Sequence, residues 1–187
     1  MLKSCWDCLV GYDLMREGTR SEEPYSVQLN GNVSRAPPWP TPRLSNEKMF
    51  VIPKRLEEED KIIVNCQTKE NPSELKIGLV TGAYTPDYDN LACQLEMLFN
   101  DNKVNIRVIQ GGNHTVEDGG FADDYNTDTN FEIKFQIRNS QQVDIFVGGS
   151  HITSVNLVHN LDNIRFLTVN GDIIRVSSLN FEYGPSY

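Results

Sequence analysis

Residues 47–187 are built from short segments in which apolar and polar side chains alternate. In FEIKFQI, residues 131–137, every second side chain is apolar, a period of two that is typical of a strand with one buried face. Ten such segments are rich in Ile, Val, Leu and Phe and bounded by Asn, Asp, Gly or Pro: MFVIP, KIIVNCQ, LKIGLVT, CQLEMLF, VNIRVIQ, FEIKFQIR, QVDIFVGG, HITSVNLV, IRFLTVN and DIIRVSSLNF. None keeps a helical apolar stripe, so the pattern predicts an all-β sandwich or closed barrel.

The connections between these segments contain turn-forming residues. NSQQ, VGGS and VNGD combine Asn, Ser, Asp and Gly, which adopt tight turns at low cost. We therefore expect consecutive hairpins at these three places.

Residues 1–46 differ from the rest of the chain. They contain RAPPWPTPR at 35–43, whose prolines favour an extended backbone, and only short apolar runs such as YSVQL at 25–29. The sequence predicts an N-terminal extension over 1–46, partly extended or disordered with one docked strand, and a β domain over 47–187.

The alternation assigns faces to the segment at 93–100. Cys93, Leu95, Met97 and Phe99 share the face predicted to be buried, so Gln94, Glu96, Leu98 and Asn100 share the outer one.

Composition excludes several classes of partner. Lys and Arg number 17 against 26 Asp and Glu, a formal charge of −9, which repels phosphate backbones and anionic lipids. No apolar window approaches the roughly 18 residues of a spanning helix, and no secretory signal is evident. We expect a cytoplasmic protein that binds neither nucleic acid nor membrane.

Metal, redox and catalytic motifs are weak. Cys66 and Cys93 lie in strand-like segments and are predicted to be buried and reduced, while CWDC at 5–8 lacks a partner pair. DDYNTDTNFE at 123–132 resembles a calcium loop but has Thr129 and Phe135 where Gly and Glu are required. No Ser-His-Asp or paired-acid set has a reason to converge. The sequence predicts no cofactor, no metal and no enzyme activity.

Two long segments resemble the galectin family. VIPKRLEEEDKIIVNCQTKENPSELKIGLVTG resembles the opening of a galectin domain. FEIKFQIRNSQQVDIFVGGSHITSVNLVHNLDNIRFLTVNGDIIRVSSLNF is similar to the galectin run F-x-I-x-I, F-x-V-x-V-N-G-x-H and L-x-x-I-x-x-L-x-I-x-G-D-I-x-L. The resemblance covers about residues 47–183. It implies a jelly-roll sandwich of two antiparallel sheets, no enzyme activity, a groove for β-galactosides, and non-classical secretion.

The resemblance places the galectin motif H-F-N-P-R on LFNDN, residues 98–102. Asn100 keeps the asparagine of the motif. Leu98 stands in place of the histidine, Asp101 in place of the proline and Asn102 in place of the arginine.

The next strand carries a further asparagine in galectins, and its equivalent here is open. Counting from the motif selects Gln110. The buried pair Ile106 and Val108 would instead turn Asn105 and Arg107 outward, where the guanidinium of Arg107 could replace the donors that Asn102 lacks.

The galectin segment W-G-x-E-x-R falls on HTVEDG, residues 114–119. Glu117 keeps the glutamate, Gly119 replaces the arginine, and His114 replaces the tryptophan. An imidazole offers less flat apolar area to a sugar than an indole, whose stacking contributes on the order of 1–3 kcal/mol.

These replacements predict an eroded galactoside groove. Each lost charge-assisted contact removes about 1.5–3 kcal/mol, and a millimolar site has only about 4 kcal/mol in total. The carbohydrate-binding candidates are Asn100, Glu117, Asn102, Arg107, Gln110, His114 and Leu98. We expect weak or altered binding of a glycan or glycoprotein by a monomer or homodimer. The alternative is a protein-interaction or structural module without a sugar site.

Overall fold

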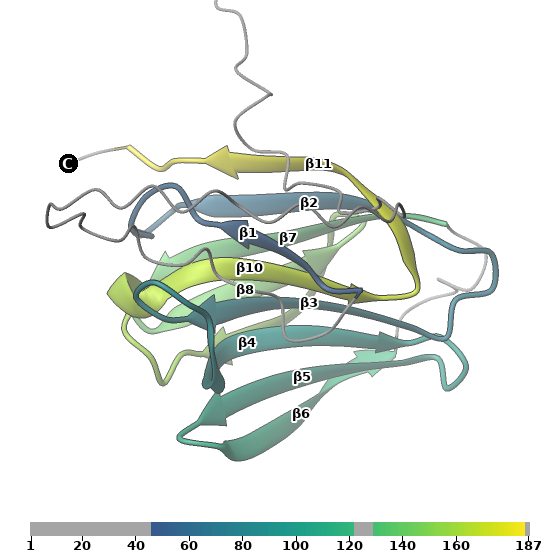
Figure 1. The fold of residues 1–187 in the computed structure, drawn as a ribbon, viewed down its shortest axis with the longest axis horizontal. Coiled ribbons are helices and arrows are strands. Elements are labelled where there is room, and N and C mark those ends of the chain that lie inside the picture. Colours follow the sequence, from purple (N-terminus) through teal and green to yellow (C-terminus); the bar gives the residue numbers. More distant parts are fainter. Residues whose placement is uncertain (1–45, 122–128, 186–187) are drawn as a thin grey trace, which may run out of the picture.

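A computed structural model describes residues 46–121 and 129–185 as two stacked antiparallel sheets (Figure 1). The six-stranded sheet has the order β1 (Lys48–Val51), β10 (Ile164–Gly171), β3 (Glu74–Thr81), β4 (Asp87–Leu98), β5 (Lys103–Gln110) and β6 (Asn113–Phe121). The five-stranded sheet has the order β11 (Ile173–Glu182), β2 (Lys61–Thr68), β7 (Asn130–Asn139), β8 (Gln142–Val147) and β9 (Ser150–Asn156). A single 3₁₀ turn, Leu161–Asn163, precedes β10, and the described residues contain no α-helix. The all-β sandwich predicted from alternation is confirmed.

The core lies between the sheets and consists of alternate residues from each strand. Phe135, Ile77, Leu95, Ile62 and Ile133 are each at most 1% exposed. The buried face expected for the segment at 93–100 is confirmed. Its four residues, Cys93, Leu95, Met97 and Phe99, are all buried.

β6 was not among the ten predicted strands, and the described residues contain eleven. Its sequence, NHTVEDGGF, has no apolar alternation. It becomes a strand because its backbone pairs with β5, from Gln110 opposite Asn113 to Lys103 opposite Phe121. Backbone hydrogen bonding along an existing strand therefore overrides a weak local preference.

The turn VNGD is not a hairpin, contrary to our expectation. β10 and β11 lie in different sheets, and Gly171, with φ of 102°, marks the corner between them. A side chain there would overlap the Glu74 carbonyl oxygen, so only glycine lets the chain turn against β3. NSQQ and VGGS do connect hairpin strands, β7 to β8 and β8 to β9.

Several predictions fall on residues that the structure does not describe. These are the extension over 1–46 apart from its last residue, the strand YSVQL, the motif CWDC and most of the acidic loop 123–132. Cys66 and Cys93 are buried and unpaired as expected, and burial raises the pKa of each thiol to about 12. Both are therefore unreactive thiols near neutral pH.

Candidate functional site

The outer face of the six-stranded sheet carries a cross-strand row of charged and amide side chains. Pairing places Lys76 of β3 opposite Glu96 of β4, Glu96 opposite Asn105 of β5, and Asn105 opposite Asp118 of β6. Arg107 lies two positions from Asn105 and so on the same face. Directly opposed residues interact across strands, and the register alone brings these groups together.

Glu96 is the centre of this network. Its residue is only 5% exposed although it lies on an outer face. Lys76 Nζ lies 3.1 Å from Glu96 Oε1, and Arg107 Nη2 lies 3.3 Å from Oε2. Asn105 Nδ2 donates to Oε2 at 3.4 Å. Three donors from two neighbouring strands thus surround one carboxylate, which we call the Glu96 network.

The network also sets the charge of its members. Burial alone would raise the pKa of Glu96, but hydrogen bonds from Lys76 and Asn105 and the charges of Arg107 and Lys76 outweigh it and lower that pKa. Desolvation alone would lower the pKa of Lys76, but hydrogen bonds to Glu74 and Glu96 raise it. Both groups are therefore ionised at neutral pH, and the donors and acceptors on this face are fixed.

Two polar atoms of the network have no hydrogen-bond partner among the described residues. They are Arg107 Nε, a donor, and Asn105 Oδ1, an acceptor, and both are shielded from solvent. An unsatisfied buried polar group costs about 1–3 kcal/mol. One atom is a donor and the other an acceptor, and a hydroxyl group can complement either role.

An apolar band crosses the same outer face beside the network. It consists of Phe166, Val80, Leu91 and Ile109, which are paired in that order across β10, β3, β4 and β5. Met49 and Tyr88 pack against the band. Leu91 and Gln94 are three positions apart and would point to opposite faces of a regular strand. A register shift in β4 between them places both on the outer face. The sheet face therefore has an apolar half and a polar half.

The structure places three of the predicted site residues on this outer face. Leu98 pairs with Lys103 at the end of β4, and Arg107 joins the Glu96 network. His114 pairs with Ile109 and is exposed at the start of β6. The open register of the strand at 104–110 is thereby settled in favour of Asn105 and Arg107 as the outward residues.

The other four predicted residues lie apart from the network. Asn100 and Asn102 belong to the β4–β5 turn, in which Asn102 N donates to Phe99 O at 3.2 Å and Asn102 has φ of 49°, a conformation that asparagine tolerates. Gln110 closes the β5–β6 hairpin. Glu117 pairs with Ile106, whose side chain is in the core, so the strand directs Glu117 to the face opposite Arg107. The seven residues are not one cluster.

The sequence pattern also indicated residues of this outer face that were not among the seven carbohydrate-binding candidates. Alternation already assigned Glu96 and Gln94 to the outer face together with Leu98, and the buried pair Ile106 and Val108 assigned Asn105 there. Lys76 could be found only from the pairing of β3 with β4, because no local pattern specifies which residues of two strands face each other.

A Ser-His-Asp set does converge, on the outer face of the five-stranded sheet. Ser154 Oγ donates to Asp144 Oδ1 at 2.7 Å and lies 3.3 Å from His151 Nε2. A nucleophilic serine instead donates its proton to the histidine. Arg138 Nε also donates to Asp144, at 2.7 Å. The cluster is thus an Arg138–Asp144 ion pair with an additional hydrogen bond from Ser154, and its geometry is not that of a catalytic triad.

The described residues hold neither a metal-ligand group nor a membrane-spanning helix. No group of three or more His, Cys, Asp or Glu residues within 46–121 and 129–185 is placed to hold a metal ion. In the same part of the chain, no helix is long and apolar enough to cross a membrane.

Comparisons with known proteins agree with this architecture. The family model for galactoside-binding lectins matches residues 48–181. Three solved structures are similar: galectin LEC-6 of Caenorhabditis elegans (15% identity, 74% of this chain and 96% of that chain, TM-score 0.60), sheep galectin-11 in complex with glycerol (17%, 74% and 99%, 0.61) and chicken galectin 2 (14%, 73% and 98%, 0.60). No curated protein sequence matches the chain.

Proposed function

The chain belongs to the galactoside-binding lectin family, the galectins, and from this membership we propose that it binds a glycan through the Glu96 network. Galectins are lectins and not enzymes, which agrees with a non-enzymatic role, and the two-sheet fold is the one that the resemblance implied. The observation that carries the proposal is the pair of unsatisfied atoms, Arg107 Nε and Asn105 Oδ1. Both atoms are shielded, whereas 33% of the Arg107 side chain is exposed. A sugar hydroxyl that displaced this side chain slightly would accept from Nε and donate to Oδ1.

The sheet register favours a different frame for the family motif. The His, Asn and Arg of H-F-N-P-R occupy alternate positions, and the alternate outer positions of β4 are Gln94, Glu96 and Leu98. In this frame Glu96 replaces the asparagine and Leu98 replaces the arginine. The second motif has Glu and Arg two residues apart, and the corresponding outer pair on β6 is Val116 and Asp118.

This frame supports an altered specificity. Leu98 on β4 stands where the family motif has an arginine, whereas Arg107 supplies a guanidinium from β5. The guanidinium donors of this face therefore lie on a different strand from that of the motif. Both tryptophans of the chain, Trp6 and Trp39, lie outside the described residues, and His114 stands where the family motif has its tryptophan. The ordinary galactoside contacts are therefore reduced, and a glycan that presents a hydroxyl to Arg107 and Asn105 is the better ligand.

Calorimetric titration of the full chain with lactose, followed by a glycan array, tests the proposal. We expect Arg107→Lys and Asn105→Ala each to weaken the binding of an array-positive glycan about tenfold, equivalent to about 1.4 kcal/mol. Lysine keeps the charge of Arg107 but lacks the planar fork of donors. Val158→Ala, an exposed change in the segment between β9 and the 3₁₀ turn, is the matched control. A silent array, or binding indifferent to both variants, would contradict the proposal.

A protein partner on the same face is the second candidate. Val116 is 54% exposed beside Arg107, and Leu98 is partly exposed, so apolar side chains border the network on this face. A silent array together with a partner recovered by the wild type and lost in Val116→Asp would favour this function over the first.

A further inference from the structure

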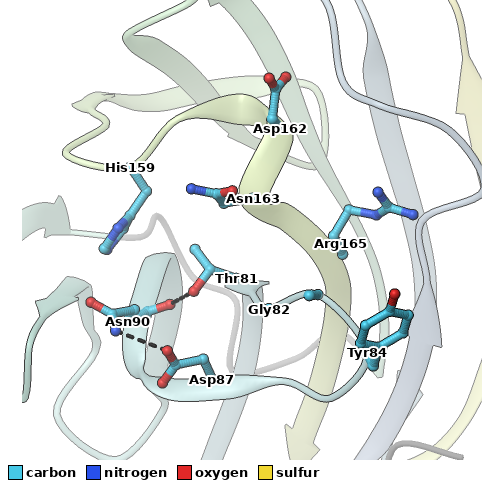
Figure 2. Close-up of a pocket in the computed structure, with 10 residues that line it drawn as sticks. Thr81, Gly82, Tyr84, Asp87, Asn90, His159, Asp162, Asn163 and Arg165 are labelled. Atoms are coloured by element: carbon cyan, nitrogen blue, oxygen red, sulfur yellow. Dashed lines mark hydrogen bonds between the residues drawn. The ribbon is translucent and has the colours of Figure 1, made fainter. Parts of the chain in front are cut away.

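A separate hollow of about 610 Å³ lies at one end of the sandwich. Its walls come from three segments: the end of β3 with the following loop, the beginning of β4, and the stretch from His159 to the beginning of β10. Figure 2 shows His159 on one side, Tyr84 on the other, and Asn163 and Thr81 between them. The volume is within the usual range for small-molecule sites, roughly 300–1,000 Å³.

Hydrogen bonds hold the floor of the hollow rigid. Asn90 Nδ2 donates to Asp87 Oδ2 at 2.9 Å, and Gly111 N donates to Asn90 Oδ1 at 2.9 Å. Thr81 Oγ1 donates to the Asn90 carbonyl oxygen (Figure 2). On the opposite wall, Gly82 N donates to Asn163 O at 2.9 Å. A lining fixed in this way need not be ordered when a ligand enters, which reduces the entropic cost of binding.

The lining is polar and presents both donors and acceptors. His159 Nε2 lies 2.8 Å from Ile109 O, and because a carbonyl only accepts, Nε2 carries the proton and Nδ1 remains an acceptor in the neutral ring. The side-chain amide of Asn163 points into the hollow and offers both a donor and an acceptor. The Asp87 carboxylate keeps further acceptor capacity beyond its bonds to Asn90 and Asp89.

Charge narrows the class of ligand. Asp162 is paired with Arg55, and in Figure 2 the heads of Asp162 and Arg165 turn away from the hollow. Asp87 is then the charged group at its floor, so a phosphate or carboxylate ligand would be repelled. No three-ligand metal group occurs in the part of the chain that the structure describes. A neutral ligand rich in hydroxyl groups fits these conditions.

The rim adds an aromatic surface. Tyr84 is 72% exposed, so most of its ring is accessible to a ligand. An exposed aromatic face beside fixed carboxylate and amide groups can cover the C–H side of a sugar ring while the polar groups bind its hydroxyls.

We propose that this hollow binds a single neutral sugar residue with adjacent hydroxyl groups, independently of the Glu96 network. The two places are distinct: Asn90 and Glu96 are six positions apart along β4, about 20 Å at roughly 3.3 Å per residue. The apolar band lies between them on the sheet face. The proposal does not depend on glycan binding at the network.

Amide-resolved NMR titration of the full chain with the methyl glycosides of galactose, glucose and mannose tests the proposal. We expect saturable shifts at the backbone amides of Gly82, Asp89 and Asn163 for at least one sugar. Tyr84→Ala and Asn163→Leu should each weaken that binding about fivefold or more, equivalent to about 1 kcal/mol. Tyr84→Phe keeps the ring and should bind nearly as the wild type does.

Arg107→Lys separates this site from the sheet face, because it alters the network and leaves the hollow unchanged. Shifts at Gly82 and Asn163 that persist in Arg107→Lys support the second site. The proposal is overturned by the absence of saturation up to about 100 mM of each sugar, well above the millimolar range of weak sites. It is equally overturned by shifts confined to residues 94–107, a result that would support the network instead.

Discussion

At the scale of single residues, Glu96 is the most constrained group of the candidate site. A carboxylate that is 5% exposed on an outer sheet face is stable only because Lys76, Arg107 and Asn105 satisfy it. The same side chain orients Arg107 and Asn105, each of which has one shielded polar atom without a hydrogen-bond partner. Glu96 therefore positions the two residues that we propose bind a glycan.

The lowered pKa of Glu96 predicts a pH-dependent contribution to folding. The carboxylate stabilises the fold above its unfolded pKa, roughly 4.3, and this contribution is lost as the pH falls through the lower folded value. We expect Glu96→Gln to reduce the free energy of unfolding at pH 7 by about 1–3 kcal/mol. Below about pH 4 the difference should shrink, because the wild-type carboxyl becomes protonated too.

Urea unfolding of both proteins near pH 7 and near pH 3 measures this difference. Glu132→Gln, which changes an exposed carboxyl on β7, is the control and should alter stability by less than about 0.5 kcal/mol. If Glu96→Gln lowered the free energy of unfolding equally at both pH values, the charge of Glu96 would not be the cause of its stabilising effect.

At the scale of elements, the β10–β11 corner is where one strand ends in one sheet and the next begins in the other. Gly171 supplies the backbone conformation, and Asp172 fastens the corner to β3. Ser73 Oγ and Ser73 N donate to Asp172 Oδ2 at 2.6 and 2.8 Å. Hydrogen bonds from Ser73, assisted by Lys69, lower the pKa of Asp172 to about 2. The corner is thus held by charge-assisted bonds.

The geometry of the β10–β11 corner predicts that substituting Gly171 by alanine strongly lowers the free energy of unfolding. Gly171→Ala should lower the free energy of unfolding by about 3 kcal/mol, since the positive φ is unfavourable for alanine and its Cβ would overlap β3. Gly111→Ala is the matched control: its φ is 55° and nothing lies within 4 Å of the added Cβ, so only the left-handed cost of about 1–2 kcal/mol applies. Denaturant unfolding that gave equal losses would refute the steric part of this explanation.

At the scale of the whole molecule, the two sheets form one sandwich over a shared core. Phe135 of β7 is fully buried and belongs to the same apolar cluster as Ile77 and Leu95 of the facing sheet. Phe131 and Phe99 bring two rings from opposite sheets to 5.4 Å. The site on the outer face therefore depends on a core that lies on the other side of its own strands.

Removing Phe135 from this core should destabilise the whole domain. We expect Phe135→Ala to cost about 3–5 kcal/mol of unfolding free energy, through lost burial and the cavity left behind. Val158→Ala, at a position 50% exposed, should change it by less than about 0.5 kcal/mol. Calorimetric melting checks both; a shift for Phe135→Ala no larger than for Val158→Ala would contradict a continuous core.

Alternation in the sequence determined the class of fold and most of its strands. Period-two segments such as FEIKFQI specify a buried face whatever they pair with, because a strand points successive side chains to opposite sides. The resemblance to galectins rested on the same strands and was correct. β6 was missed because its polar sequence is strand only through pairing with β5.

The candidate site depended on tertiary structure. Asn100 and Asn102, predicted from the sequence, lie in the β4–β5 turn. Lys76 and Glu96 come together because β3 and β4 pair in one particular register. The hollow beside Tyr84 combines two stretches, 81–90 and 159–165, that are far apart in the chain. A sequence specifies which face a side chain takes on its own strand; which residues meet across strands depends on backbone pairing, and only the folded sheets fix that.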